Sequence, residues 1–192
     1  MSAKIKMGAR CNTDVEMAGK NPSRFLVSSQ VKWECFDTQG KPVWQDENHN
    51  VCTIQGLNHL LNVAFHGATQ ISPWYVAVFE DNYTSLEADT YAVPGYTEST
   101  AYDEATRPEY VEASASGKVM TNSANKASFT FNAAKTIYGS GLVGGGSAPS
   151  TKGDTAGSGT LYAAAKFSTG GKPVDVGYVL KVTWTLTGSD VS

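Results

Sequence analysis

Short segments of the chain alternate large apolar residues with polar ones, and stretches rich in glycine and other small residues separate them. The alternation is clean at 31–35, 129–131 and 182–186, and this period-two pattern is typical of strands with one buried face. The turn residues of 37–40 lie between the first of these segments and Val43-Trp44. They predict a β-hairpin in which Gly40 takes a positive φ. Further strands are expected over 74–79, 161–167 and 179–186.

One segment has helical periodicity instead. Apolar residues fall at 57, 60, 61, 64 and 65, so a helix near 54–66 would carry a single apolar stripe. Gly67 is well placed to end this helix. The simplest packing lays the stripe across one face of a sheet, because neither element can bury its apolar side alone. The predicted core residues are then Leu57, Leu60, Leu61, Phe65, Trp74, Val76, Phe129, Phe131 and Trp184.

These elements favour a mainly β fold in a single domain. We expect an antiparallel sandwich or barrel, jelly-roll-like in one possible form, with one short helix near 54–66 and long loops. The length of 192 residues suits one domain. Residues 1–24 lack apolar periodicity and are expected to form an extended or poorly ordered N-terminal arm, with the β-rich domain over 25–192.

Composition and cysteine spacing indicate the cellular compartment in which the protein is expected. No stretch approaches the roughly 18 consecutive apolar residues of a membrane-spanning helix, and no apolar region of a secretory signal follows the basic N-terminus. The three cysteines have no spacing typical of a disulfide framework. We therefore expect no membrane partner, and free thiols in a reducing cytoplasm.

Two segments lack regular patterning. The first, 81–110, is long for a loop in a compact domain, and such loops are often functional. Tyrosine and arginine are enriched in interface cores, so the candidate interface residues are Tyr91, Tyr96, Tyr102, Arg107 and Tyr110. The alternative, that the tyrosines fasten the loop to its own domain, stays open. The second, 139–160, is either a flexible loop or a stretch where backbones approach closely.

Charge is distributed unevenly along the sequence. Residues 80–112 carry nine acids and one base, whereas 113–181 carry seven lysines and two acids. Opposite charges of this kind can guide neighbouring copies or a partner into register, or they can simply form two solvated surfaces. Because the lysines are scattered and arginine is scarce, we expect no direct binding of nucleic acid.

No motif predicts catalysis. Residues 139–144 match G-x-G-x-x-G, but Gly145, Gly146 and Pro149 follow, so no helix is available to bind a pyrophosphate and the segment is predicted to be a loop. His59 and His66 would lie about 10 Å apart along the helix, too far to share a metal ion. The acid-rich stretch has no calcium-loop pattern. We therefore expect a non-enzymatic protein with no metal site and no cofactor.

Several motifs occur in a characteristic order over about 50–187. They are Gly56-Leu57-Asn58-His59-Leu60-Leu61, Phe65-His66-Gly67, Trp74-Tyr75-Val76, Tyr96-Thr97-Glu98, Tyr102, Arg107-Pro108, Phe129-Thr130-Phe131 and Gly159-Thr160-Leu161-Tyr162. This set resembles a group of small structural proteins from the virions of tailed bacteriophages.

The resemblance implies a β-rich coat component that assembles in the host cytoplasm and resides on the virion. Its expected role is that of a capsid decoration or cement protein, a homo-oligomer that binds the major capsid protein and stabilises the shell. A head–tail junction or tail component is an alternative. From the residues alone, a glycan- or receptor-binding β module with aromatic platforms from Tyr91, Tyr96 and Tyr102 also stays open.

Overall fold

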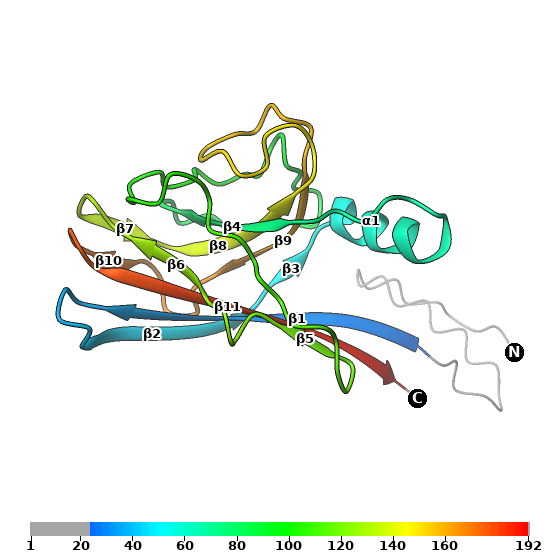
Figure 1. Ribbon diagram of the computed structural model, residues 1–192, viewed down its shortest axis with the longest axis horizontal. Coiled ribbons are helices and arrows are strands. Elements are labelled where there is room, and N and C mark those ends of the chain that lie inside the picture. The colour runs from blue at the N-terminus through cyan, green and yellow to red at the C-terminus, as the bar shows by residue number, and fades with distance from the viewer. Residues whose placement is uncertain (1–23, 192) are drawn as a thin grey trace, which may run out of the picture.

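The structure, a computed structural model, describes residues 24–191. The described chain is mainly β, with antiparallel sheets that do not close into a barrel (Figure 1). This confirms the predicted fold class and favours a sandwich. The predicted N-terminal arm lies, except for Arg24, outside the described residues.

The larger sheet, sheet A, contains both ends of the described chain. Its strands are β1 (Arg24–Phe36), β2 (Pro42–His49), β5 (Val119–Thr121), β6 (Ala127–Thr130) and β11 (Val179–Val191). The strand order is β2-β1-β11-β5, and β6 also pairs with β11. The expected hairpin joins β1 to β2, with Gly40 at φ +75° in its turn. β1 and β11 pair along their full lengths, from Arg24 opposite Val191 to Phe36 opposite Val179.

The second sheet, sheet B, has the order β3-β9-β8-β4. Its strands are β3 (Val51–Cys52), β4 (Trp74–Phe79), β8 (Gly139–Gly144) and β9 (Thr160–Lys166). A separate two-stranded sheet pairs β7 (Lys135–Ile137) with β10 (Lys172–Val174). The predicted helix is α1 (Ile54–Phe65). Its N-terminus is capped by Thr53, whose side chain accepts a hydrogen bond from the Gly56 amide at 2.9 Å.

The two sheets pack face to face around one main core. Alternate residues of β1 and β11 point inward, and they meet Val76, Val78 and the small residues of β9. The indole Nε1 of Trp33 in sheet A donates a hydrogen bond to the Ser140 hydroxyl in sheet B at 3.0 Å. Both groups are fully buried, so this bond joins the sheets across the core. Among the predicted core residues, Val76, Phe129, Phe131 and Trp184 are fully buried, and the half-buried Trp74 packs against them.

The glycine-rich segment 139–144 is a strand, so the predicted loop at this position was wrong. It forms β8, which lies between β4 and β9, and every one of its six residues is buried. Sheet A covers one face of sheet B, and the 81–110 loop covers the other. A strand buried on both faces has no apolar–polar alternation. Close approach explains the glycines: an added Cβ at Gly141 would collide with the hydroxyl end of Tyr96, and one at Gly139 with the Phe79 ring and the backbone of Ala165.

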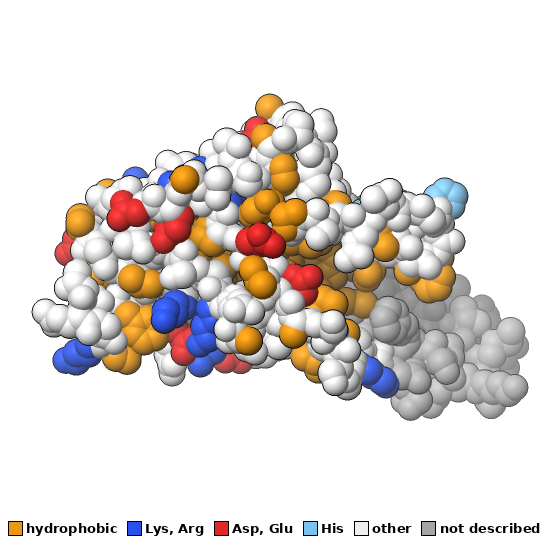
Figure 2. All heavy atoms as spheres, viewed as in Figure 1, with side chains coloured by type: hydrophobic (Ala, Val, Ile, Leu, Met, Phe, Trp, Pro, Cys, Tyr) orange, Lys and Arg blue, Asp and Glu red, His pale blue; other side chains and the backbone are white. Residues whose placement is uncertain are grey.

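The helix does not lie across a sheet face as predicted. α1 contacts β9 at the end of sheet B and extends beyond it (Figure 1). Leu57, Leu61 and Phe65 are therefore 37%, 53% and 85% exposed, and Leu60 is half-buried. Apolar side chains gather on and beneath the helix in Figure 2. Gly56, the one residue of α1 that is buried, packs against Tyr162. The Gln55 side chain forms hydrogen bonds with backbone groups of Tyr91, Gly159 and Leu161.

We predict that Gly56→Ala destabilises the protein. Alanine normally stabilises a helix interior by about 1 kcal/mol relative to glycine. Here its Cβ would lie within 3.0 Å of three backbone atoms of Tyr162, which cannot rotate away. We expect a loss of about 1–3 kcal/mol in the free energy of unfolding, measured by urea denaturation. Asn58→Ala, at an exposed position of the same helix, is the control and should leave stability unchanged or slightly higher. A stabilised Gly56→Ala variant would contradict the tight contact between α1 and β9.

Candidate functional site: a clamped loop layer and an apolar cleft

Two loops cover the outer face of sheet B and form what we call the loop layer, residues 81–110 and 145–159. Glu98 and Glu109 make single β-bridges to β4, at Phe79 and Tyr75. The Tyr96 ring stacks on Phe79 with centroids 4.6 Å apart. Tyr91 and Tyr96 complete a second apolar cluster on this side of the sheet, with Phe79, Val143, Leu161 and Ala164.

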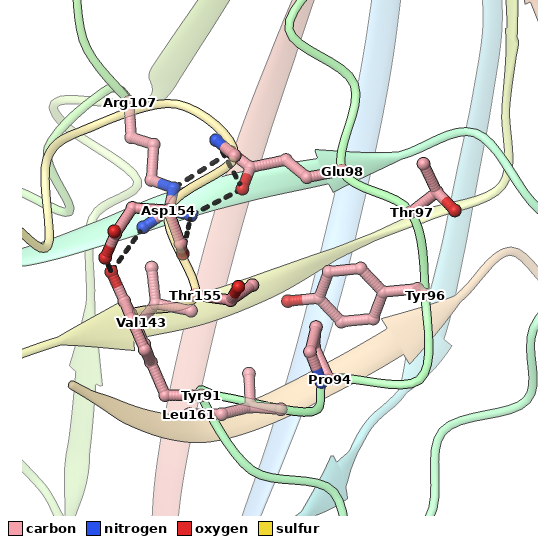
Figure 3. A pocket seen from close by; sticks show the side chains of 11 residues that line it. Tyr91, Pro94, Tyr96, Thr97, Glu98, Arg107, Val143, Asp154, Thr155 and Leu161 are labelled. Carbon is pink, nitrogen blue, oxygen red and sulfur yellow. Dashed lines mark hydrogen bonds and ion pairs between the residues drawn. The ribbon is translucent and has the colours of Figure 1, made fainter. Parts of the chain in front are cut away.

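Arg107 holds the loop layer together from within. Its Nε and Nη2 donate to the two carboxylate oxygens of Glu98 at 2.8 and 2.5 Å. Its Nη1 donates to the Tyr91 hydroxyl at 3.1 Å and to the Pro149 carbonyl at 2.9 Å. Nη2 also donates to the Asp154 carbonyl at 2.9 Å. A guanidinium has five N–H donors, so all of them are used, and they tie both loops to one buried side chain (Figure 3).

The electrostatics of this cluster keep Arg107 charged. Burial alone would lower the pKa of Arg107, but the hydrogen bonds and charge of Glu98 outweigh it and raise this pKa overall. The Tyr91 hydroxyl donates to a carboxylate oxygen of Asp154 at 2.7 Å. Burial and this bond raise the pKa of Tyr91, and the same bond lowers the pKa of Asp154. Tyr91 therefore stays neutral at physiological pH while Asp154 stays ionised.

The predicted interface residues are buried within their own chain. Tyr91, Tyr96, Tyr102, Arg107 and Tyr110 are each 8% exposed or less within their own chain. Tyr102 packs edge-on against Phe129, and Tyr110 donates its backbone amide to the Trp74 carbonyl at 2.8 Å. Tyr91 and Tyr96 cover the apolar outer face of sheet B with their rings, whereas Tyr102 and Tyr110 pack into the main core. The alternative interpretation, that they fasten the loop to its own domain, describes these five residues.

A cavity of about 320 Å³ lies within the loop layer, but its charged groups are already paired. Glu98, Arg107 and Asp154 line it, and they bond to one another or to Tyr91 (Figure 3). The bonds hold the Arg107 and Glu98 side chains in place, and the Tyr91 hydroxyl holds one carboxylate oxygen of Asp154. The cluster therefore acts as a structural clamp. Sequence reasoning singled out Arg107 but missed Glu98 and Asp154, because only the fold brings the two loops together.

Cys35 and His59 are engaged in packing, whereas His66, at the C-cap of α1, is exposed. Burial raises the pKa of the Cys35 thiol to about 12, so this cysteine is protonated and inert at neutral pH. His59 Nε2 accepts a hydrogen bond from the Ile71 amide at 3.4 Å, and its ring packs edge-on against Trp74. Within residues 24–191, no three His, Cys, Asp or Glu side chains lie close enough to hold a metal ion. The described part of the chain also contains no helix long and apolar enough to cross a membrane.

An open apolar cleft, the α1 cleft, lies between the helix and the inner face of sheet A. Its volume is about 560 Å³. Its apolar lining consists of Val27, Leu60, Leu61, Ala64, Phe65, Ala115, Met120, Tyr162 and Leu186. A second hollow of about 310 Å³ shares four of these residues and extends toward Trp74 and His59. The cleft is thus continuous with the apolar interior of the sandwich.

The α1 cleft exists because the two sheets differ in length. β1 pairs with β11 back to Arg24, whereas β2 accompanies β1 only from Gln30 and β5 accompanies β11 only to Thr187. The remaining β1–β11 ribbon extends under α1, beyond the end of sheet B (Figure 1). No strand of residues 24–191 lies opposite its inner face, which carries Val27. The helix and the ribbon therefore form two apolar walls with nothing described between them.

Neither a protein-family model nor a curated protein sequence matches the chain. The functional argument therefore rests on the clamp, the cleft and the sequence motifs.

We predict that Arg107→Ala destabilises the protein far more than Leu61→Ala, the reverse of what a core position for Leu61 and an interface position for Arg107 would give. Removing the guanidinium leaves Glu98 buried without its counter-ion, which should cost about 3–5 kcal/mol. Leu61 is half exposed, so its truncation should cost about 1 kcal/mol or less. Chemical denaturation of both variants checks this order.

The double variant Arg107→Ala/Glu98→Ala serves as the control for the clamp. It removes the stranded charge, so it should recover part of the stability lost in Arg107→Ala. If Leu61→Ala were the more damaging change, the clamp would not be the main support of the loop layer.

Proposed function

We propose that the protein is a non-enzymatic structural component of a tailed-phage virion. Its role would be to decorate the capsid, binding the major capsid protein and assembling as a homo-oligomer on the shell. The sequence motifs support the phage assignment. The observation that carries the proposal is the exposed apolar stripe of α1, Ile54, Leu57, Leu61 and Phe65, beside an open cleft.

The stripe has the form of a protein-docking surface. Its residues are spaced by three, four and four positions, so they follow one face of the helix. Ile54, Leu61 and Phe65 are each at least half exposed. Contiguous exposed apolar patches on soluble proteins commonly mark interaction sites. Full burial of such a side chain contributes about 1.5–3 kcal/mol, so a partner that covers the stripe gains substantial binding energy.

The rest of the molecule suits a cementing role. The sheets are joined through Trp33 and Ser140, and the loop layer is clamped through Arg107. A body of this kind resists deformation. Each copy could then span a junction between capsid subunits through α1 and add contact area that holds the shell against internal pressure.

A head–tail junction or tail location would use the same surface and differ in copy number. Purified particles should contain many more copies of a decoration protein than of any tail protein. The glycan-binding alternative loses its basis, because Tyr91, Tyr96 and Tyr102 are buried and form no exposed aromatic platform.

We predict that Leu61→Ser/Phe65→Ser abolishes binding to capsid shells without unfolding the protein. The reason is that both side chains are largely exposed and their loss removes the centre and end of the stripe. Co-sedimentation with shells that lack the protein measures binding, and the melting temperature reports folding.

Leu86→Ser/Val93→Ser is the matched control, since these residues are 56% and 70% exposed but belong to the loop layer. It should bind shells normally. Equal loss of binding in both double variants would argue against α1 as the docking surface.

A further inference from the structure

We propose that the apolar space beneath α1 is a binding site for a small uncharged amphiphile, a molecule with an aliphatic chain and an oxygen head that accepts hydrogen bonds. The head would lie in the hollow of about 310 Å³ that extends toward Trp74, here called the inner hollow. Tyr110 and Tyr162 would donate to it, and the wider α1 cleft would hold the chain. This site goes beyond the proposed role on the capsid and does not depend on it.

Two tyrosines in the wall of the inner hollow carry buried hydroxyl groups without a partner. Tyr110 and Tyr162 line the hollow and are 3% and 5% exposed. Within residues 24–191, neither hydroxyl oxygen has a hydrogen-bond partner. Most buried polar groups in proteins are hydrogen-bonded, and a buried donor without an acceptor is destabilising. An acceptor oxygen on a bound molecule would satisfy these donors.

The electrostatics of the inner hollow define the head group. Burial raises the pKa of Tyr162, and burial together with the charges of Glu112 and Tyr162 raises the pKa of Tyr110. Both phenols therefore stay neutral and can donate. No Asp, Glu, Lys or Arg is among the described residues that line this hollow, so a charged head would be buried there without a counter-ion. The head that fits is a hydroxyl or carbonyl oxygen.

The α1 cleft has the form that an aliphatic chain requires. Its volume of about 560 Å³ lies within the range of about 300–1,000 Å³ that is typical of small-molecule sites. One molecule can extend through both spaces, because their linings share Leu60, Met120, Tyr162 and Leu186. Lys118 is the single charged residue among the described residues that line the cleft. An anionic amphiphile with its head at Lys118 is therefore the competing arrangement.

Titration of the full chain with decanol tests the site. A ligand that binds only the folded state raises the melting temperature, so decanol should raise it in the original chain. The double variant Tyr110→Phe/Tyr162→Phe removes both donors and should bind decanol about tenfold more weakly, measured by calorimetry. Without decanol, this variant should melt no lower than the original chain, because it loses only hydroxyls that have no partner among the described residues.

Tyr102→Phe is the matched control. The Tyr102 hydroxyl is also buried without a partner among the described residues, but Tyr102 lines neither the inner hollow nor the α1 cleft. This variant should bind decanol as tightly as the original chain. Equal affinity of all three proteins for decanol would overturn the inference, as would the absence of binding to the original chain. Water molecules that satisfy both hydroxyls would give such a result.

Decanoate at neutral pH separates the two orientations. If the head lies between the tyrosines, decanoate should bind severalfold more weakly than decanol, and Lys118→Gln should leave decanol binding unchanged. Intermolecular NOEs should connect the methylene beside the decanol hydroxyl to the rings of Tyr110 and Tyr162. Tighter binding of decanoate that is lost in Lys118→Gln but kept in Tyr110→Phe/Tyr162→Phe would place the head at Lys118 and overturn the inference.

Discussion

The buried ion pair between Arg107 and Glu98 is the constraint on which the layered architecture depends. A charge removed from water is tolerated only when its partners satisfy it fully, and here the guanidinium uses every donor. Those bonds fix two loops at once, and the loops are the only cover that the outer face of sheet B has among the described residues. With that cover in place, β8 can be a strand of small residues buried on both sides. The glycines of β8 and the Arg107 clamp thus both serve the close packing of the loops on the outer face of sheet B.

Periodicity in the sequence predicted the elements that have one apolar and one polar face. β1 and β11 alternate because one side meets sheet B and the other meets water. The same reasoning missed β8, where both sides are covered and Gly139, Gly141 and Gly144 supply space instead of apolar surface. A glycine-rich strand and a glycine-rich loop look alike in sequence, because the difference lies in what packs above them. Here the side chains that pack against the glycines are Tyr96 and Phe79, which are far away along the chain.

The helix and the tyrosines show a second limit of prediction from sequence: a pattern does not reveal which surface a residue packs against. The spacing of apolar residues correctly located α1 and its stripe, but a stripe indicates only that a surface favours burial. It does not say whether the same chain supplies the cover. Gly56 determines which face of α1 packs against the body. Because it has no side chain, the helix can approach Tyr162 with a face other than the stripe. Conversely, tyrosine and arginine suit an interface and a loop anchor equally well. Only the positions of Glu98 and Asp154, which the fold determines, distinguish the two for Arg107.

The clamp and the cleft lie at two different boundaries of sheet B, its outer face and its end beneath α1. On one side of sheet B, a long loop is held against the sheet by a buried charge whose hydrogen bonds are all satisfied. At the far end, sheet A extends past sheet B, and the apolar interior continues into the open α1 cleft. The cleft and the helix stripe beside it are therefore an extension of the protein's own apolar core that the described residues leave uncovered. A partner that covered this surface would gain its binding free energy from the burial of apolar side chains that the fold itself leaves exposed.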